Sequence, residues 1–238
     1  MPEQTNTQII QQLRKFDTAT ICNVIATYPG SDICLKLYDA WHGEYYTDQT
    51  LHCMYPEIGP ICGYAATAWY SEASPNYTAL DRWTLPDHIA DTKKPTILVA
   101  KQTYPPELRN LSGLFGGNMT IQFKAQGVIG IVTDGPMRDF EEIKPMNTQY
   151  LATGLTSGHG NIALRGANIP VKLAGMAVSP GDIVHMDICG AAKFPASKLA
   201  KVLENATELS RRETEQQKPF RDLGFTLAKW KESEQKKK

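Results

Sequence analysis

The sequence lacks an excess of either charge: 25 Lys and Arg residues face 25 Asp and Glu residues, so its formal net charge is zero. A general nucleic-acid binder presents a basic surface, so this balance argues against a nucleic-acid partner. No apolar run approaches the roughly 20 residues that span a bilayer, which argues against a membrane partner. Residues 1–12 lack the apolar core of a secretory signal. We therefore expect a cytoplasmic protein.

Paired cysteines are also missing. The chain has five cysteines, an odd number, and none of them forms a C-x-x-C pair. Reduced thiols in a cytosolic protein fit this pattern better than a disulfide framework. The His and Cys residues between positions 42 and 62 match no standard zinc spacing. Cys189 has no base beside it in the sequence, so we expect a small buried thiol rather than a nucleophile.

What is present is typical of one α/β domain, because 238 residues with 42% hydrophobic side chains can bury a substantial core. Helical apolar spacing begins near Ile9, and Asp17 is a plausible cap for a second helix. Apolar patterns predict strands over 61–69, 96–101, 127–134, 171–178 and 182–187, and helices over 119–125, 140–146 and 196–212. We expect a single domain over 1–230 and a charged, disordered tail over 231–238.

A glycine-rich loop is the first candidate for chemistry. Gly113, Gly116 and Gly117 open a predicted helix whose first free amides belong to Asn118 and Met119. Unpaired amides and the helix dipole both favour negative charge, so this helix start is a candidate site for an anionic substrate. The spacing matches neither the dinucleotide fingerprint nor the P-loop, which argues against a nucleotide ligand.

Arg138 and Asp139 follow the buried strand 127–134. An arginine fork suits a carboxylate, and an aspartate is a hard oxygen ligand that suits Mg²⁺. Together they would hold a small 2-oxo acid against a metal ion. The alternative is that Asp139 caps the following helix and Arg138 is a surface residue. His159, in a second glycine-rich loop, either contacts the substrate or bonds to a backbone group. We expect His185 to be packed within a strand or at an interface.

Three segments, in order, carry a resemblance to a known family. The D-G-x-x-R-D signature is met by Asp134, Gly135, Arg138 and Asp139. The segment 150–160 and the turn motif P-G-D-x-V-x-x-D at 180–187 follow it. From about 96 to 223 the chain resembles the RraA-like family, which includes regulators of ribonuclease activity A and 4-hydroxy-4-methyl-2-oxoglutarate aldolases.

The resemblance implies an α-β-β-α sandwich of the swivelling-domain type, assembled as a homotrimer or homohexamer with the active site between subunits. Family enzymes are divalent-metal aldolases or oxaloacetate decarboxylases. The resemblance therefore implies a carbon–carbon lyase that acts on a pyruvate-type 2-oxo acid and uses Mg²⁺ or Mn²⁺ as cofactor.

The resemblance also assigns roles to residues. Arg138 would bind the substrate carboxylate and stabilise the enolate, and Asp139 would ligate the metal. Backbone amides at Asn118 and Met119 would bind the 2-oxo acid. A glutamate on the C-terminal helix of the neighbouring subunit would hold waters of the metal, and Glu213 is the match by spacing.

The chain departs from the family pattern in ways that leave alternatives open. Many family enzymes carry an acid just after the loop glycine, where this chain has Gly117, and no acid ends the preceding strand, which reads Lys101-Gln102-Thr103. One alternative is a non-catalytic binding protein, like the ribonuclease-regulator branch. Another is the same scaffold with an altered substrate and chemistry.

Overall fold

A mixed sheet of eight strands forms the centre of the computed structural model, which describes residues 4–235. The strand order is β12-β11-β4-β5-β6-β7-β3, and β8 pairs with β4. The strands are β3 (His52–Cys53), β4 (Ile61–Glu72), β5 (Thr96–Gln102), β6 (Val128–Thr133), β7 (Gln149–Ala152), β8 (Ile162–Ala167), β11 (Ile183–Asp187) and β12 (Gly190–Phe194). Strands β4 to β7 are parallel, so all four end at one edge. The pairs that involve β3, β8, β11 and β12 are antiparallel.

Two short two-stranded sheets accompany the main sheet. Strands β1 (Ala26–Thr27) and β2 (Tyr38–Asp39) are parallel, and β9 (Val171–Leu173) and β10 (Met176–Val178) form an antiparallel hairpin. The prediction of one continuous strand over 171–178 is therefore wrong. Ala174 and Gly175 both have positive φ, 44° and 85°, and two such residues in succession reverse the chain.

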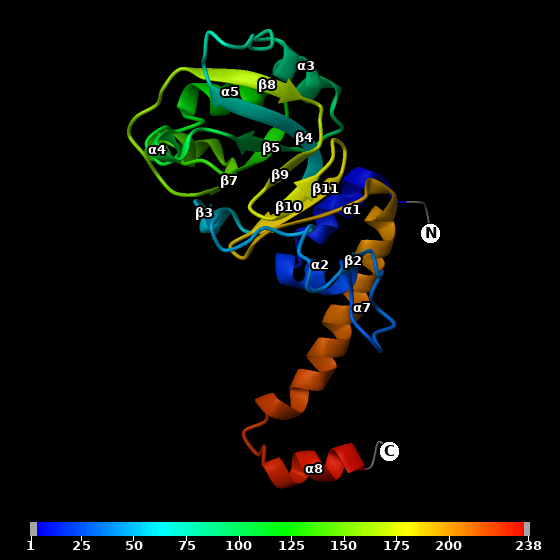
Figure 1. Ribbon diagram of the computed structural model, residues 1–238. Coiled ribbons are helices and arrows are strands. Elements are labelled where there is room, and N and C mark those ends of the chain that lie inside the picture. The colour runs from blue at the N-terminus through cyan, green and yellow to red at the C-terminus, as the bar shows by residue number, and fades with distance from the viewer. Residues whose placement is uncertain (1–3, 236–238) are drawn as a thin grey trace.

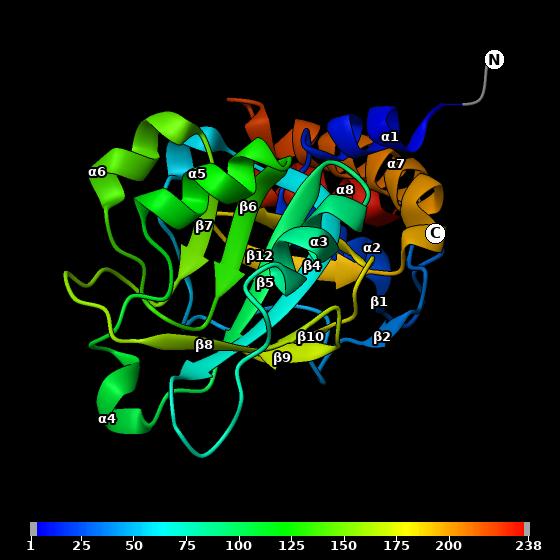
Figure 2. The ribbon, with the colours of Figure 1, turned by 90° about the horizontal axis from the view of Figure 1, so that it is seen from above.

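Helices cover the main sheet on two sides. They are α1 (Asn6–Leu13), α2 (Thr18–Ile25), α3 (Thr84–Asp91), α4 (Pro106–Arg109), α5 (Gly117–Ala125), α6 (Phe140–Ile143), α7 (Leu199–Gln217) and α8 (Leu227–Gln235), with 3-10 turns at Pro56–Ile58, Lys144–Met146, Ala196–Lys198 and Lys218–Arg221. Helices α3, α5 and α6 lie along the parallel strands (Figure 2), and α1, α2 and α7 pack on the strands β11 and β12.

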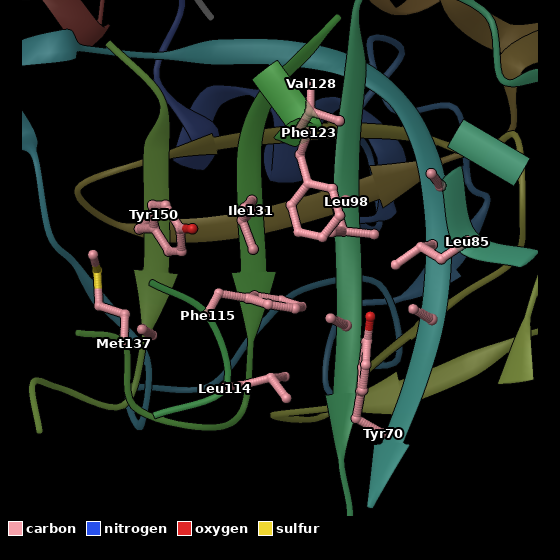
Figure 3. Close-up of a cluster of buried hydrophobic side chains, with 14 of the residues drawn as sticks. Tyr70, Leu85, Leu98, Leu114, Phe115, Phe123, Val128, Ile131, Met137 and Tyr150 are labelled. Atoms are coloured by element: carbon pink, nitrogen blue, oxygen red, sulfur yellow. The ribbon is translucent and has the colours of Figure 1, made fainter. Parts of the chain in front are cut away.

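Three apolar clusters show that the layers follow an α-β-β-α order. The first joins α3 and α5 to the parallel strands (Figure 3) and includes Leu85, Leu98, Phe123, Ile131 and Tyr150. The second lies between the parallel strands and the strands β9 to β12, and it includes Val99, Val132, Val171, Met176 and Val184. The third joins β11 and β12 to α1, α2 and α7 and includes Ile10, Val24, Ile183, Phe194 and Val202. Successive side chains of a buried strand point to opposite faces of the sheet and therefore pack in different clusters. The expected α-β-β-α sandwich is confirmed.

A buried histidine on β11 connects helices α1 and α2 to the sheet through hydrogen bonds. His185 on β11 is fully buried, and its Nδ1 lies 2.9 Å from the Thr18 hydroxyl. Its Nε2 lies 3.2 Å from the Leu13 carbonyl, which can only accept, so Nε2 carries the proton. Asp187 Oδ2 accepts a hydrogen bond from the Thr18 amide at 2.8 Å. The expected packing of His185 is confirmed, as is the cap at Asp17, which accepts from Thr20 N at 2.7 Å.

The C-terminal helices extend away from the sheet (Figure 1). Only the first half of α7 is buried, through Leu199, Val202, Leu203 and Ala206, and α8 lies beyond its far end. The expected disordered tail is wrong for 231–235, which belong to α8, while 236–238 lie outside the described residues. The Phe220 ring packs 5.1 Å from the Trp230 ring and anchors α8. Within residues 4–235, no helix has the length and apolar character to cross a membrane.

Candidate active site at the ends of the parallel strands

The loops that follow β5, β6 and β7 lie side by side at the carboxyl edge of the parallel strands. Leu114 N donates to Pro136 O at 3.0 Å, and Arg138 N donates to Phe115 O at 3.1 Å. Figure 3 shows Leu114 and Met137 near the arrowheads of these strands. Ligands of parallel sheets bind at this edge, because the loops there are free to present side chains. The backbone bonds between the loops hold those side chains in fixed positions.

A cavity of about 670 Å³ opens at this edge. Its lining comes from four loops and the first turn of α5: Ala73, Gly113, Leu114, Gly116, Asn118, Met119, Arg138, Asp139, His159, Gly160, Asn161 and Ile162. The volume falls in the range of small-molecule sites. The structure thus brings together the loop glycine, the helix start, the Arg-Asp pair and His159, all of which the sequence analysis singled out.

Asp139 adopts an unusual backbone conformation that turns its carboxylate toward α5. Its φ of 59° and ψ of 39° are left-handed, a region that aspartate tolerates better than most residues. Its Oδ2 accepts a hydrogen bond from Gly117 N at 3.0 Å and lies 3.3 Å from Arg138 Nε. Asp139 occupies the cap position of α6, yet its side chain makes no capping bond there. The capping alternative for this side chain is therefore wrong.

Glu142 is a site residue that the sequence analysis missed. A Cβ built on Gly117 would lie 2.2 Å from Glu142 Cδ, so the Glu142 carboxylate occupies the space beside this glycine. A Cβ on Gly116 would lie 2.3 Å from Asp139 Oδ2. The Asp139 and Glu142 carboxylates therefore lie against two adjacent glycines at the start of α5. The missing loop acid at Gly117 is matched by an acid from α6, whose carboxylate occupies the space beside this glycine.

Asp134, the first residue of the D-G-x-x-R-D signature, has a structural role. Its carboxylate forms an ion pair with Lys101 Nζ and accepts a hydrogen bond from Gln102 N at 2.6 Å. These contacts tie the end of β6 to the end of β5. Lys101 and Asp134 do not belong to the described lining of the cavity.

The remaining candidates fall in three places. His159 lines the cavity, and its Nδ1 lies 3.2 Å from Gly160 O, so the bond to a backbone group is confirmed and the contact with substrate stays a prediction. Glu213 lies on α7 and is not among the residues that line the cavity of its own chain; its role concerns a neighbouring subunit and stays a prediction. Cys189 is exposed in the β11–β12 turn, so the expectation of burial is wrong. Desolvation and the Asp187 charge raise the pKa of this thiol, which disfavours a nucleophilic thiolate.

The donor set at the cavity is small. Between residues 4 and 235, no three His, Cys, Asp or Glu side chains gather in a way that could hold a metal ion. Asp139 lines the cavity beside Arg138, and Glu142, against Gly117, is a second hard oxygen donor outside the described lining. The chain is thus an α-β-β-α protein with a candidate small-molecule site at the ends of its parallel strands.

Comparison with known proteins specifies this class. The model of the family described as RraA-like, Aldolase/RraA, matches residues 19–192. The chain belongs to the RraA-like family.

Individual relatives are distant. The chain is 31% identical to "Uncharacterized protein MJ0644" of Methanocaldococcus jannaschii over 103 residues, which is 43% of this chain and 50% of that protein. It is 32% identical to "Putative 4-hydroxy-4-methyl-2-oxoglutarate aldolase" of Halalkalibacterium halodurans over 89 residues, 35% of this chain and 40% of that protein. The matched region thus spans half or less of these relatives. The crystal structure of Streptomyces coelicolor RraAS2, described as an unusual member of the RNase ES inhibitor RraA protein family, superposes with a TM-score of 0.69 at 19% identity over 90% of this chain and 98% of that chain. This likeness supports the fold alone.

Proposed function

We propose that this protein is a divalent-metal-dependent lyase that cleaves a carbon–carbon bond in a pyruvate-type 2-oxo acid. One observation carries the proposal: Arg138 and Asp139 line the cavity together beside the start of α5, where the Glu142 carboxylate lies against Gly117. The family includes proteins named as aldolases, which supports the same reaction class. We further propose that it acts in the cytoplasm as a homotrimer or homohexamer.

The donor chemistry fits Mg²⁺ or Mn²⁺. Mg²⁺ is commonly bound by one or two carboxylates, with the substrate and waters completing its shell, and soft ligands are not needed. Asp139 would ligate the ion, and Glu142 would hold it directly or through water. When bound, the ion would draw electrons from the 2-oxo carbonyl and so lower the barrier to bond cleavage.

The residues of the chain would carry out the other parts of the reaction. The Arg138 guanidinium would hold the substrate carboxylate through two parallel hydrogen bonds and offset charge on the developing enolate. Asn118 N and Met119 N have no acceptor four residues back within α5, so they are free to donate to an anionic oxygen. Asp139 Oδ2, bonded to Gly117 N, would keep the donor set aligned with this helix start.

The test is pyruvate release from oxaloacetate, 4-hydroxy-4-methyl-2-oxoglutarate and 4-hydroxy-2-oxopentanoate, with Mg²⁺ and with EDTA. We expect release above the metal-only background from at least one of them. Asp139→Asn, which suits the left-handed backbone, should lower kcat by about 100-fold or more. The control is Asp87→Asn on α3, outside the cavity lining, which should not change kcat. Silence on all three substrates from folded protein would contradict the proposal, and capture of a ribonuclease by the same protein would then favour the binding role.

A further inference from the structure

The part of the cavity wall that one chain supplies carries no permanent positive charge beyond Arg138 among the described residues. Among the described residues of the lining, Arg138 is the only lysine or arginine, and the acids beside it add negative charge. The rest of the wall is apolar or neutral: Ala73, Gly113, Leu114, Gly116, Asn118, Met119, His159, Gly160, Asn161 and Ile162. The apolar side chains come from different elements, because Leu114 precedes α5 and Ile162 begins β8.

This charge pattern limits how many carboxylates a ligand can bring. The guanidinium of Arg138 presents one planar fork, and the substrate carboxylate next to the carbonyl uses it. Lys101, at the end of β5, is held in an ion pair with Asp134 and lies outside the described lining. A second carboxylate on the tail of the ligand would lose water against Leu114, Met119 and Ile162 without a cation to compensate.

We infer that the site selects 2-oxo acids that carry a single carboxylate and a neutral tail. The inference rests on the proposed function and specifies its substrate class. The Nδ1–H of His159 donates to Gly160 O, so Nε2 of the neutral ring is an acceptor. This acceptor and the Asn118 and Asn161 amides suit a hydroxyl on the tail better than a carboxylate.

The reaction can be written for the simplest such substrate with a branched tail, 4-hydroxy-4-methyl-2-oxopentanoate. The C3–C4 bond breaks, and its electron pair forms the enolate of pyruvate. The hydroxyl proton leaves as C4 becomes the carbonyl of acetone, and a proton from water returns to C3. One substrate yields one pyruvate and one acetone, without any oxidant or reductant.

The first test is a matched pair of substrates. 4-Hydroxy-4-methyl-2-oxopentanoate and 4-hydroxy-4-methyl-2-oxoglutarate differ only by a methyl group or a carboxylate on C4. With Mg²⁺, we expect kcat/KM to favour the neutral tail by about tenfold or more. Asn161→Lys, which adds a cation to the wall, should shift this ratio toward the diacid by about tenfold. Gln122→Lys, on α5 but outside the lining, is the matched control and should leave the ratio unchanged.

The second test measures binding without turnover. Calorimetric titration of the full chain with Mg²⁺ compares 2-oxopentanoate with 2-oxoglutarate, which have the same carbon chain. Tighter binding of 2-oxopentanoate supports the inference, and equal or tighter binding of 2-oxoglutarate overturns it, as does failure of both to bind. Metal-dependent cleavage with a preference for the diacid would overturn the inference and leave the proposed reaction standing. Tighter binding of 2-oxopentanoate without cleavage of any substrate would contradict the proposed lyase reaction. The inferred preference of the cavity for a neutral tail would then still stand.

Discussion

Glu142 and Gly117 are complementary at the level of single residues, because the side chain of one fills the space beside the other. We predict that Glu142→Gln raises the Kd for Mg²⁺ by about 10- to 100-fold, since an amide is a weaker ligand than a carboxylate and a weaker acceptor for metal-bound water. The measurement is a Mg²⁺ titration by calorimetry. Glu141→Gln, the adjacent exposed residue of α6, is the control and should bind Mg²⁺ as the unmodified chain does. Equal weakening by both variants would show a general charge effect instead of a specific contact.

Gly117→Ala tests the same contact from the other side. The new methyl group would overlap the far end of the flexible Glu142 side chain, so the carboxylate should swing away while the fold stays intact. We predict an unchanged free energy of unfolding within about 1 kcal/mol, because alanine is also the better helix former, and a weaker Mg²⁺ affinity like that of Glu142→Gln. The double variant should bind Mg²⁺ no more weakly than Glu142→Gln alone. Additive losses would contradict the assigned contact.

Lys101 illustrates a different kind of residue, one that matters for stability. Asp134 is only 9% exposed, and Lys101→Met would leave its carboxylate without a cation. We predict a loss of about 1–3 kcal/mol in the free energy of unfolding, measured by urea denaturation. Adding Asp134→Asn should recover part of this loss, because the unpaired charge is removed. A double variant that is less stable than Lys101→Met would contradict this explanation.

At the scale of elements, the contact of α1 and α2 with β11 depends on a neutral His185. Burial lowers the pKa of this imidazole below its ordinary value of 6.5, although the nearby Asp187 and Asp17 charges act in the opposite direction. Below pH 6.5 the unfolded chain binds a proton that the folded chain excludes. The stability that the neutral ring contributes is therefore complete above pH 6.5 and decreases as the pH falls, by at most about 1.4 kcal/mol per pH unit.

The corresponding prediction concerns the pH profile of unfolding. His185→Gln should lower stability at about pH 7.5, because the bonds to Thr18 and Leu13 are disturbed, and should flatten the decline toward about pH 5. The measurement is the urea midpoint across this range at one protein concentration. The difference between the two profiles isolates His185 from other titrating groups. Parallel profiles would contradict the role of this ring.

The sequence predicted best those elements whose residues share one kind of environment, such as a strand that is buried on both faces. Strand β6 is an almost continuous apolar run because both of its faces are buried, and this pattern predicted it within one residue at each end. Strand β8 was missed because Ile162–Ala167 contains Arg165 and Gly166 and shows neither a continuous apolar run nor a regular alternation. The β9–β10 turn was missed because Ala174 is an unusual residue at positive φ. These failures reflect tertiary context, which a single sequence does not display.

The candidate site also contains residues that the local sequence predicted and residues that only the tertiary structure revealed. The residues made the glycine-rich loop and the Arg138–Asp139 pair candidates for chemistry and left helix capping open as an alternative, and the resemblance to the RraA-like family assigned their roles. Glu142 was not recognisable, because its position depends on the left-handed backbone of Asp139 and on empty space beside Gly117. The role of Asp134 was also hidden, since its partner Lys101 lies on another strand. Sequence motifs thus predicted residues that line the cavity, and the structure added the residues that contact or support the elements around it.

At the scale of the whole molecule, the proposed assembly places part of each site on a neighbouring chain. Glu213 lies in the half of α7 that extends away from the sheet, outside the cavity of its own chain (Figure 1). If a neighbour supplies Glu213, a chain with Asp139→Asn and a chain with Glu213→Gln carry defects in different halves of one shared site. Each variant alone should then lose most of its Mg²⁺-dependent pyruvate release.

Mixing the two variants tests this arrangement. After dissociation and reassembly of a 1:1 mixture, some sites combine an intact Asp139 from one chain with an intact Glu213 from the next. Random cyclic assembly predicts recovery of about one quarter of the sites, because each intact half is present with a probability of one half. Reassembly of either variant with itself is the control and should recover nothing. Activity of the mixture no higher than the mean of the two controls would show that each chain builds its site alone, and Glu213 would then have no part in it.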